Sequence, residues 1–250
     1  MNPLLHIHQL GVSYGGLRAV DDVSIDVHTD RVMGLIGPNG AGKTTTIDAI
    51  CGFVPKATGI IELAGRRLES LPPHSRARAG LVRTFQSVEL FDDLTIRENL
   101  IVAASAPRWY STMLDAIHPN RRVTAESVSD AIEMTKINDL IDLRPKQLSH
   151  GQRRIVGVAR ALAGKPKLVL LDEPAAGLDP DETDKLGELI ASLPKRGIGV
   201  LLVDHDMTLV LDVCDDITVL DFGRVIATGT PQEIRGNQAV IAAYLGSAHE

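Results

Sequence analysis

The sequence has no uninterrupted apolar stretch approaching about 18 residues, the shortest run expected to cross a bilayer as a helix. Its first residues also lack the basic start and the long apolar segment of a secretion signal. We therefore expect a chain that does not cross a membrane and carries no such signal. At 250 residues, 44% of them hydrophobic, it is long enough to bury a sizeable core.

Cysteine is scarce. The two cysteines, Cys51 and Cys214, have no CxxC pair or histidine cluster beside them, which argues against zinc and fits a reducing cytosol. Basic residues are fewer than acidic ones: 26 lysines and arginines against 32 aspartates and glutamates give a net charge of −6. A broad basic face for nucleic acid is therefore not indicated.

The chain does contain several patterned segments. Apolar residues alternate from Leu5 to Val12 and from Val20 to Val27 on either side of Gly15-Gly16, which predicts an antiparallel pair of strands. A continuous apolar run at 32–36 predicts a buried strand that enters a glycine-rich loop and a helix beginning near Lys43. A second short hairpin is expected around 59–63.

The pattern becomes helical between about 88 and 148. Apolar residues at 95–104 and 124–137 have helical spacing, and Thr124 followed by Glu126 predicts a helix cap with an acidic first turn. The stretch 106–122 has no clean period, and we interpret the whole region as a helical insertion.

Features of a parallel sheet return afterwards. The apolar runs at 168–171 and 200–203 are typical of strands buried on both faces, and the helical pattern at 181–193 supplies the crossover between them. A closing hairpin is expected at 217–226, followed by a short helical end.

The strongest motif lies at 37–44, where GPNGAGKT matches GxxxxGK[ST] between a strand and a helix. Its glycines allow backbone amides to surround phosphate oxygens, and the helix N-terminus adds a positive dipole. Lys43 can reach the β- and γ-phosphates, the Thr44 hydroxyl can bind Mg²⁺, and Thr45 is placed beside the α-phosphate.

A second motif, KLVLLDE at 167–173, combines an apolar strand with two terminal carboxylates. This is the arrangement that a P-loop ATPase requires. Asp172 is expected to hold Mg²⁺, directly or through water, and Glu173 to polarise the attacking water as general base.

Three more motifs occur in a fixed order: Thr84-Phe85-Gln86, the segment LSHGQ at 148–152, and Asp204-His205. With the P-loop before them, they resemble the Q-loop, signature sequence and H-loop of ABC transporter ATP-binding subunits. The resemblance covers essentially the whole chain, from Leu5 to about Gly246.

This resemblance implies further roles. Tyr14 resembles the aromatic residue that stacks on adenine, and Gln86 and His205 resemble the residues that contact the metal, the lytic water or the γ-phosphate. Ser149, Gly151 and Gln152 would face the nucleotide of a second subunit, and so would Asp179. The full set of expected nucleotide contacts within the P-loop is Gly37, Asn39, Gly40, Ala41, Gly42, Lys43, Thr44 and Thr45.

The signature departs from the usual pattern in one place, since His150 replaces its middle glycine. A large ring-bearing residue there is common in importer ATPases for branched-chain amino acids. The segments at 82–99 and 229–246 are similar to that subfamily as well. ATPases of urea importers and lipopolysaccharide exporters are alternatives, as are a soluble ABC ATPase acting on nucleic acid and a regulatory cassette that binds ATP without hydrolysis.

The resemblance implies an α/β P-loop cassette with a RecA-like core, an antiparallel β subdomain and an inserted helical subdomain. The expected boundaries are 1–86 and 151–235 for the core with its β subdomain, 87–150 for the helical subdomain and 236–250 for a helical tail. The cofactors would be ATP and Mg²⁺. The partners would be a second, identical or paralogous ATPase subunit and transmembrane permease subunits, with a solute-binding protein acting indirectly. The chain would lie on the cytoplasmic face of the cell membrane.

Overall fold

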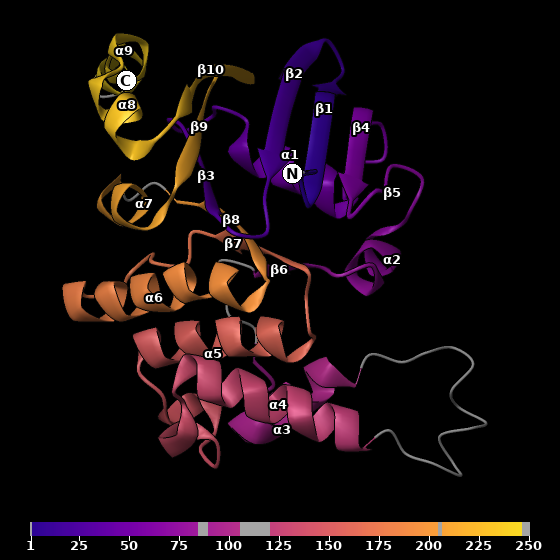
Figure 1. Cartoon of the computed structure of the whole chain (residues 1–250), viewed down its shortest axis with the longest axis vertical. Helices are drawn as coiled ribbons and strands as arrows, with labels where there is room; N and C mark the ends of the chain where they lie inside the picture. The colour runs from indigo at the N-terminus through magenta and orange to yellow at the C-terminus, as the bar shows by residue number, and fades with distance from the viewer. Residues whose placement is uncertain (1, 85–89, 106–120, 205–206, 247–250) are drawn as a thin grey trace.

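The structure is a computed structural model that describes residues 2–84, 90–105, 121–204 and 207–246 (Figure 1). Two sheets and a group of helices make up this part of the chain. None of its helices combines the length and the apolar character that crossing a bilayer demands.

The first sheet is antiparallel and has the strand order β2-β1-β4-β5. β1 (Leu5–Tyr14) pairs with β2 (Leu17–Val27) around the Gly15-Gly16 turn, and β1 also pairs with β4 (Thr58–Leu63). β4 continues into β5 (Arg66–Arg67). The antiparallel pair and the second hairpin are confirmed.

The second sheet has the order β10-β9-β3-β8-β7-β6 and is parallel except for β10 at its edge. Its strands are β3 (Val32–Ile36), β6 (Leu81–Thr84), β7 (Leu168–Asp172), β8 (Gly199–Val203), β9 (Asp216–Asp221) and β10 (Arg224–Gly229). Every residue of β3, β7 and β8 is buried, as expected for strands covered on both faces. The predicted closing hairpin is β9–β10.

Helix α1 (Lys43–Cys51) lies between the two sheets (Figure 1). Its buried residues belong to one apolar cluster with residues of both sheets, including Leu5, Leu35 and Leu170. Because α1 begins where β3 ends, this packing fixes the intervening glycine-rich loop at the carboxyl edge of the parallel sheet.

Every helix from α3 to α9 contributes residues to a second apolar cluster, whereas α2 contacts α1 and β6. Figure 1 shows α3 (Ile96–Ala104), α4 (Arg121–Thr135) and α5 (His150–Ala163) grouped below the sheets, and each of the three contacts the other two. α6 (Pro180–Ser192) provides the expected crossover between β7 and β8. The other helices are α2 (Pro73–Arg78), α7 (Met207–Val213), α8 (Pro231–Gly236) and α9 (Gln238–Gly246).

Of the helical features predicted between 88 and 148, the helix at 95–104 is confirmed and the cap at Thr124 is not. Thr95 caps α3 in a reciprocal pair with Glu98, and the helix predicted there is confirmed. The cap predicted at Thr124 is wrong, because α4 already begins at Arg121 and its first turn contains no acidic residue. The two arginines before Thr124 favour helix and extend it toward the N-terminus. Most of the irregular stretch 106–122 lies outside the described residues.

Candidate functional site

The loop from Gly37 to Gly42 joins β3 to α1 and depends on glycine at two points. Gly37 and Gly42 have φ angles of 153° and 98°, which disfavour residues with a side chain. A Cβ at Gly37 would lie 2.1 Å from the carbonyl oxygen of Leu220, and one at Gly42 would lie 2.6 Å from that of Ala19. The loop is therefore held tightly against neighbouring backbone, and its helix starts at Lys43 as predicted.

The Lys43 ammonium folds back over this loop. Its Nζ donates hydrogen bonds to the carbonyl oxygens of Gly37 and Pro38 at 2.6 and 2.9 Å. Burial lowers the pKa of Lys43, while the nearby carboxylates of Glu173 and Asp172 oppose that shift. Lys43 thus lies near the two carboxylates at the end of β7, as the two motifs require. Thr44 is exposed and Thr45 half-buried in the first turn of α1.

Asp172 and Glu173 differ in their surroundings. Asp172 ends β7 and is 7% exposed, whereas Glu173 is half-buried. Glu173 has a φ of 46°, and its amide donates to the Val203 carbonyl oxygen at 2.7 Å. A non-glycine residue in the left-handed region is strained, and such strain concentrates at functional sites. The backbone therefore presents Glu173 away from the strand direction in a fixed orientation.

Arg83, on β6, binds Asp172. Its Nη2 donates to Asp172 Oδ2 at 2.7 Å, and its Nη1 donates to Asp48 Oδ1 at 2.5 Å. The sequence alone did not predict a role for Arg83. The available signal was an arginine in a short apolar strand, since a buried guanidinium requires acidic partners.

The signature residues lie at the beginning of α5. Ser149 is the N-cap: its hydroxyl accepts from the Gln152 amide at 3.1 Å, and Gln152 Oε1 accepts from the Ser149 amide at 2.9 Å. Helix α5 begins at His150, directly after this cap. His150 and Gly151 therefore belong to the first helical turn, where amide groups carry the positive end of the dipole.

Glu182 of α6 lies against this turn, and Asp179 is the N-cap of α6. Asp179 caps α6 by accepting from the Glu182 amide at 2.8 Å. The Glu182 carboxylate accepts from the Asp179 amide and from the Ser149 hydroxyl, each at 3.4 Å. A Cβ at Gly151 would lie 2.1 Å from that carboxylate. Glu182, which sequence reasoning missed, thus connects the signature turn to Asp179.

His150 also contacts the loop before α6. A Cβ at Gly177 would lie 3.2 Å from Cε1 of the His150 ring, so the ring packs over this glycine. The position that departs from the usual signature is accommodated within the same chain.

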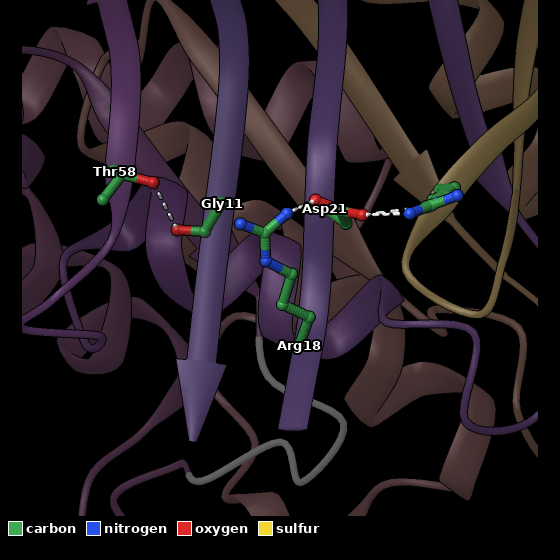
Figure 2. Close-up of polar contacts among 5 residues, drawn as sticks. Gly11, Arg18, Asp21 and Thr58 are labelled. Carbon is green, nitrogen blue, oxygen red and sulfur yellow. Dashed lines mark hydrogen bonds and ion pairs between the residues drawn. The ribbon is translucent and has the colours of Figure 1, made fainter. Parts of the chain in front are cut away.

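Tyr14 is 55% exposed at the end of β1, beside the hairpin turn. The adjacent strand β2 is tied to the second sheet through Asp21, whose pKa is lowered by hydrogen bonds from Arg224 and Arg18. Figure 2 shows Arg18 reaching Asp21 on this strand. Arg224 binds the same carboxylate through Nε and Nη2, at 2.9 and 2.6 Å.

The tip of the β9–β10 hairpin completes this connection. The Asp21 amide donates to the Gly223 carbonyl oxygen at 2.8 Å, and the Gly223 amide donates to the Ala41 carbonyl oxygen at 3.0 Å. The sheet that carries Tyr14 is therefore fixed relative to the glycine-rich loop. Asn39 and Gly40 are exposed on that loop.

Gln86 and His205 lie outside the described residues. Their neighbours are described: Thr84 ends β6, and Asp204 is 1% exposed, its Oδ2 accepting from the Ala175 amide at 3.3 Å. Apart from Tyr14 on β1, the described site residues thus fall into two groups, one around Lys43 and one around Ser149 at the starts of α5 and α6.

Comparison with known proteins gives consistent matches. The sequence profile described as ABC transporter matches residues 20–176, and the profile described as branched-chain amino acid ATP-binding cassette transporter matches residues 224–250. The chain is 41% identical to the high-affinity branched-chain amino acid transport ATP-binding protein BraF of Pseudomonas aeruginosa, over 98% of this chain and 99% of BraF. It is 38% identical to the lipopolysaccharide export system ATP-binding protein LptB of Haemophilus influenzae, over 97% of each chain.

A solved structure has the same architecture. An ATP-binding cassette of an ABC transporter in its ADP conformation superposes with a TM-score of 0.85 at 29% identity, covering 98% of this chain and 100% of the other.

Proposed function

This chain belongs to the ABC transporter family and is an ATP-hydrolysing subunit of it, and we propose that it energises import of branched-chain, hydrophobic amino acids. The observation that carries the solute class is the 41% identity to BraF over almost the full length of both chains. The match of residues 224–250 to the branched-chain amino acid profile points the same way, because that segment lies beyond the shared ATPase motifs. Export of lipopolysaccharide is the second candidate, on the similarity to LptB.

In the proposed reaction, amides of the glycine-rich loop and the Lys43 ammonium bind the β- and γ-phosphates of ATP. Lys43 exchanges its present acceptors, the carbonyl oxygens of Gly37 and Pro38, for phosphate oxygens. Tyr14, exposed at the end of β1, offers a flat face to adenine. Catalysis then rests on positioning and on charge stabilisation, without a covalent intermediate.

The carboxyl end of β7 is chemically suited to Mg²⁺. Asp172 supplies a carboxylate and Thr44 a hydroxyl, which are the hard oxygen ligands that this ion prefers. When bound, Mg²⁺ neutralises charge on the phosphates. We assign Thr44, Asp172 and Gln86 to holding it, Glu173 to accepting a proton from the attacking water, and His205 to hydrogen-bonding the γ-phosphate.

Hydrolysis requires a second ATPase subunit. Ser149, Gly151 and Gln152 line the N-terminal turn of α5, whose dipole favours an anion, and we propose that they contact the γ-phosphate held by the other subunit. Asp179, next to them, would reach the same partner site. ATP would then join two cassettes, and its hydrolysis would separate them.

The permease is proposed to contact the side of the core where β6 and α2 meet. A pocket of about 280 Å³ is found there, lined by Cys51, Phe53, Ala77 and Arg83 among others. Phe53, which lines this pocket, is 51% exposed. Apolar side chains beside a pocket suit a short amphipathic helix from a membrane protein. Such docking would place this subunit at the cytoplasmic membrane face.

The test is reconstitution. The chain is purified with the permease subunits encoded beside its gene and placed in proteoliposomes with internal ATP and an external solute-binding protein. Uptake of labelled leucine, isoleucine or valine supports the proposal, provided that Glu173→Gln abolishes uptake. An active ATPase that moves none of these solutes, but releases lipopolysaccharide from a membrane, would replace import by export.

A further inference from the structure

Arg83 occupies a place where three elements meet. It lies on β6, opposite Leu170 of β7, and its guanidinium binds Asp172 at the end of β7 and Asp48 on α1. The two nitrogen–oxygen distances are 2.7 and 2.5 Å. One planar group therefore connects the strand before the Q-loop to the helix that follows the P-loop and to the carboxylate proposed to hold Mg²⁺.

The ion pair between Arg83 and Asp172 is almost fully buried, so each charge depends on the other. The side chains of Arg83 and Asp172 are 10% and 9% exposed, while that of Asp48 is 33% exposed. A buried carboxylate requires compensating charge and hydrogen bonds. Lysine cannot reproduce the arrangement, because its single ammonium lacks the planar pair of nitrogens that reaches two carboxylates at once. Arg83 thus sets where Asp172 lies relative to α1.

The same side chain lines the pocket proposed to receive the permease, together with Cys51, Phe53 and Ala77. Arg83 is also three residues before Gln86 on the same segment. Arg83 therefore belongs to the lining of that pocket and also binds the carboxylate proposed to hold the metal. A displacement of β6 by an occupant of the pocket must move the partner of Asp172.

We propose that Arg83 is a positioning residue that orients Asp172 and carries the effect of permease docking from the pocket to the hydrolysis site. This inference rests on the proposed function and adds a route of communication to it. In this proposal Arg83 acts on the site through its bonds to Asp172 and Asp48.

The test compares Arg83→Lys and Arg83→Met with the wild type and with Arg66→Met, which removes an exposed arginine of β5. Binding of a fluorescent ATP analogue is titrated with Mg²⁺, and ATP hydrolysis is measured with and without the permease subunits. Thermal unfolding in EDTA reports on the fold without nucleotide or metal.

Arg83→Met removes the guanidinium that binds the Asp172 and Asp48 carboxylates. Its melting temperature in EDTA should fall, and its half-saturating Mg²⁺ concentration should decrease about threefold, since an uncompensated carboxylate attracts a cation more strongly. Its kcat should nevertheless fall about tenfold. Arg83→Lys keeps the charge but cannot bind both carboxylates at once, so its half-saturating Mg²⁺ concentration should change less than that of Arg83→Met, while stimulation of hydrolysis by the permease should be lost. Arg66→Met should match the wild type throughout.

If Arg83 only stabilised the fold, the kcat of each variant would fall in proportion to its folded fraction. The half-saturating Mg²⁺ concentration and the stimulation of hydrolysis by the permease would then stay unchanged. That pattern, or full stimulation of Arg83→Lys, overturns the inference. If the wild-type chain itself is not stimulated by any permease, the proposed function fails instead, so the two failures are distinguishable.

Discussion

Gly151 offers a way to separate folding from function with one methyl group. It occupies the second position of α5, and an added Cβ would lie 2.1 Å from both the carboxyl carbon and Oε1 of Glu182. No real contact is that short, so the Glu182 side chain must move away. Movement would cost its hydrogen bonds from the Ser149 hydroxyl and the Asp179 amide, both 3.4 Å long.

Gly151→Ala makes two opposing contributions to the free energy of unfolding, and they nearly cancel. Alanine is favoured over glycine within a helix by about 1 kcal/mol. Two long, half-exposed hydrogen bonds contribute roughly 0.5 kcal/mol each, the low end of the usual range. Gly151→Ala should therefore leave the free energy of unfolding within about 0.5 kcal/mol of the wild type. In a Glu182→Ala background the clash is absent. There, Gly151→Ala should raise the free energy of unfolding by about 1 kcal/mol.

Activity should respond differently. The new methyl group stands on the face of α5 proposed to approach the partner's γ-phosphate, so Gly151→Ala should reduce ATP hydrolysis strongly in both backgrounds. Urea denaturation of the four proteins, without nucleotide, gives the coupling energy, and steady-state hydrolysis gives the activity. Gly236→Ala, where a Cβ meets open space, serves as the control. Additive stabilities of Gly151→Ala and Glu182→Ala would refute the reasoning.

Three further predictions concern stability and reactivity. Phe222 is 86% exposed, has a φ of 44° and begins a two-residue hairpin turn of a type that favours Asn-Gly. Phe222→Asn should therefore raise the free energy of unfolding by about 1 kcal/mol and the melting temperature by about 3 °C. Arg76 is 4% exposed and donates to four backbone carbonyls, two of them at the end of α1, so Arg76→Lys should lower the free energy of unfolding in urea by about 2 kcal/mol. Burial raises the pKa of the Cys51 and Cys214 thiols to about 12. Their thiolate fraction at pH 8 is therefore on the order of a thousandfold below that of a free cysteine, and labelling with a thiol reagent should be slow until urea unfolds the chain.

The elements that hold the first group of site residues were predictable from sequence, because their signals are local. A continuous apolar run identified β3, and the glycine spacing with Lys43 located the start of α1. The Asp172-Glu173 pair was recognisable from the apolar strand before it. Short helices without a clear apolar period, α2 and α7, were not predicted.

What sequence could not provide were contacts between distant segments. Arg83 binds partners 35 and 89 residues away, and Glu182 approaches a residue 33 positions earlier. Such pairings are set by how β6, β7 and the two helices pack, not by local propensity. The error at the start of α4 has another origin: Thr124 resembles a cap locally, yet the helix continues through the residues before it.

The central claim is that the loop around Lys43 binds Mg·ATP for hydrolysis. Calorimetric titration with a slowly hydrolysed ATP analogue, in the presence of Mg²⁺, tests it most directly on the purified chain. The account predicts saturable binding by the wild type and at least tenfold weaker binding by Lys43→Ala, with both proteins equally folded. Equal binding by the two proteins, or none by the wild type alone or with its natural partner subunit, would contradict it.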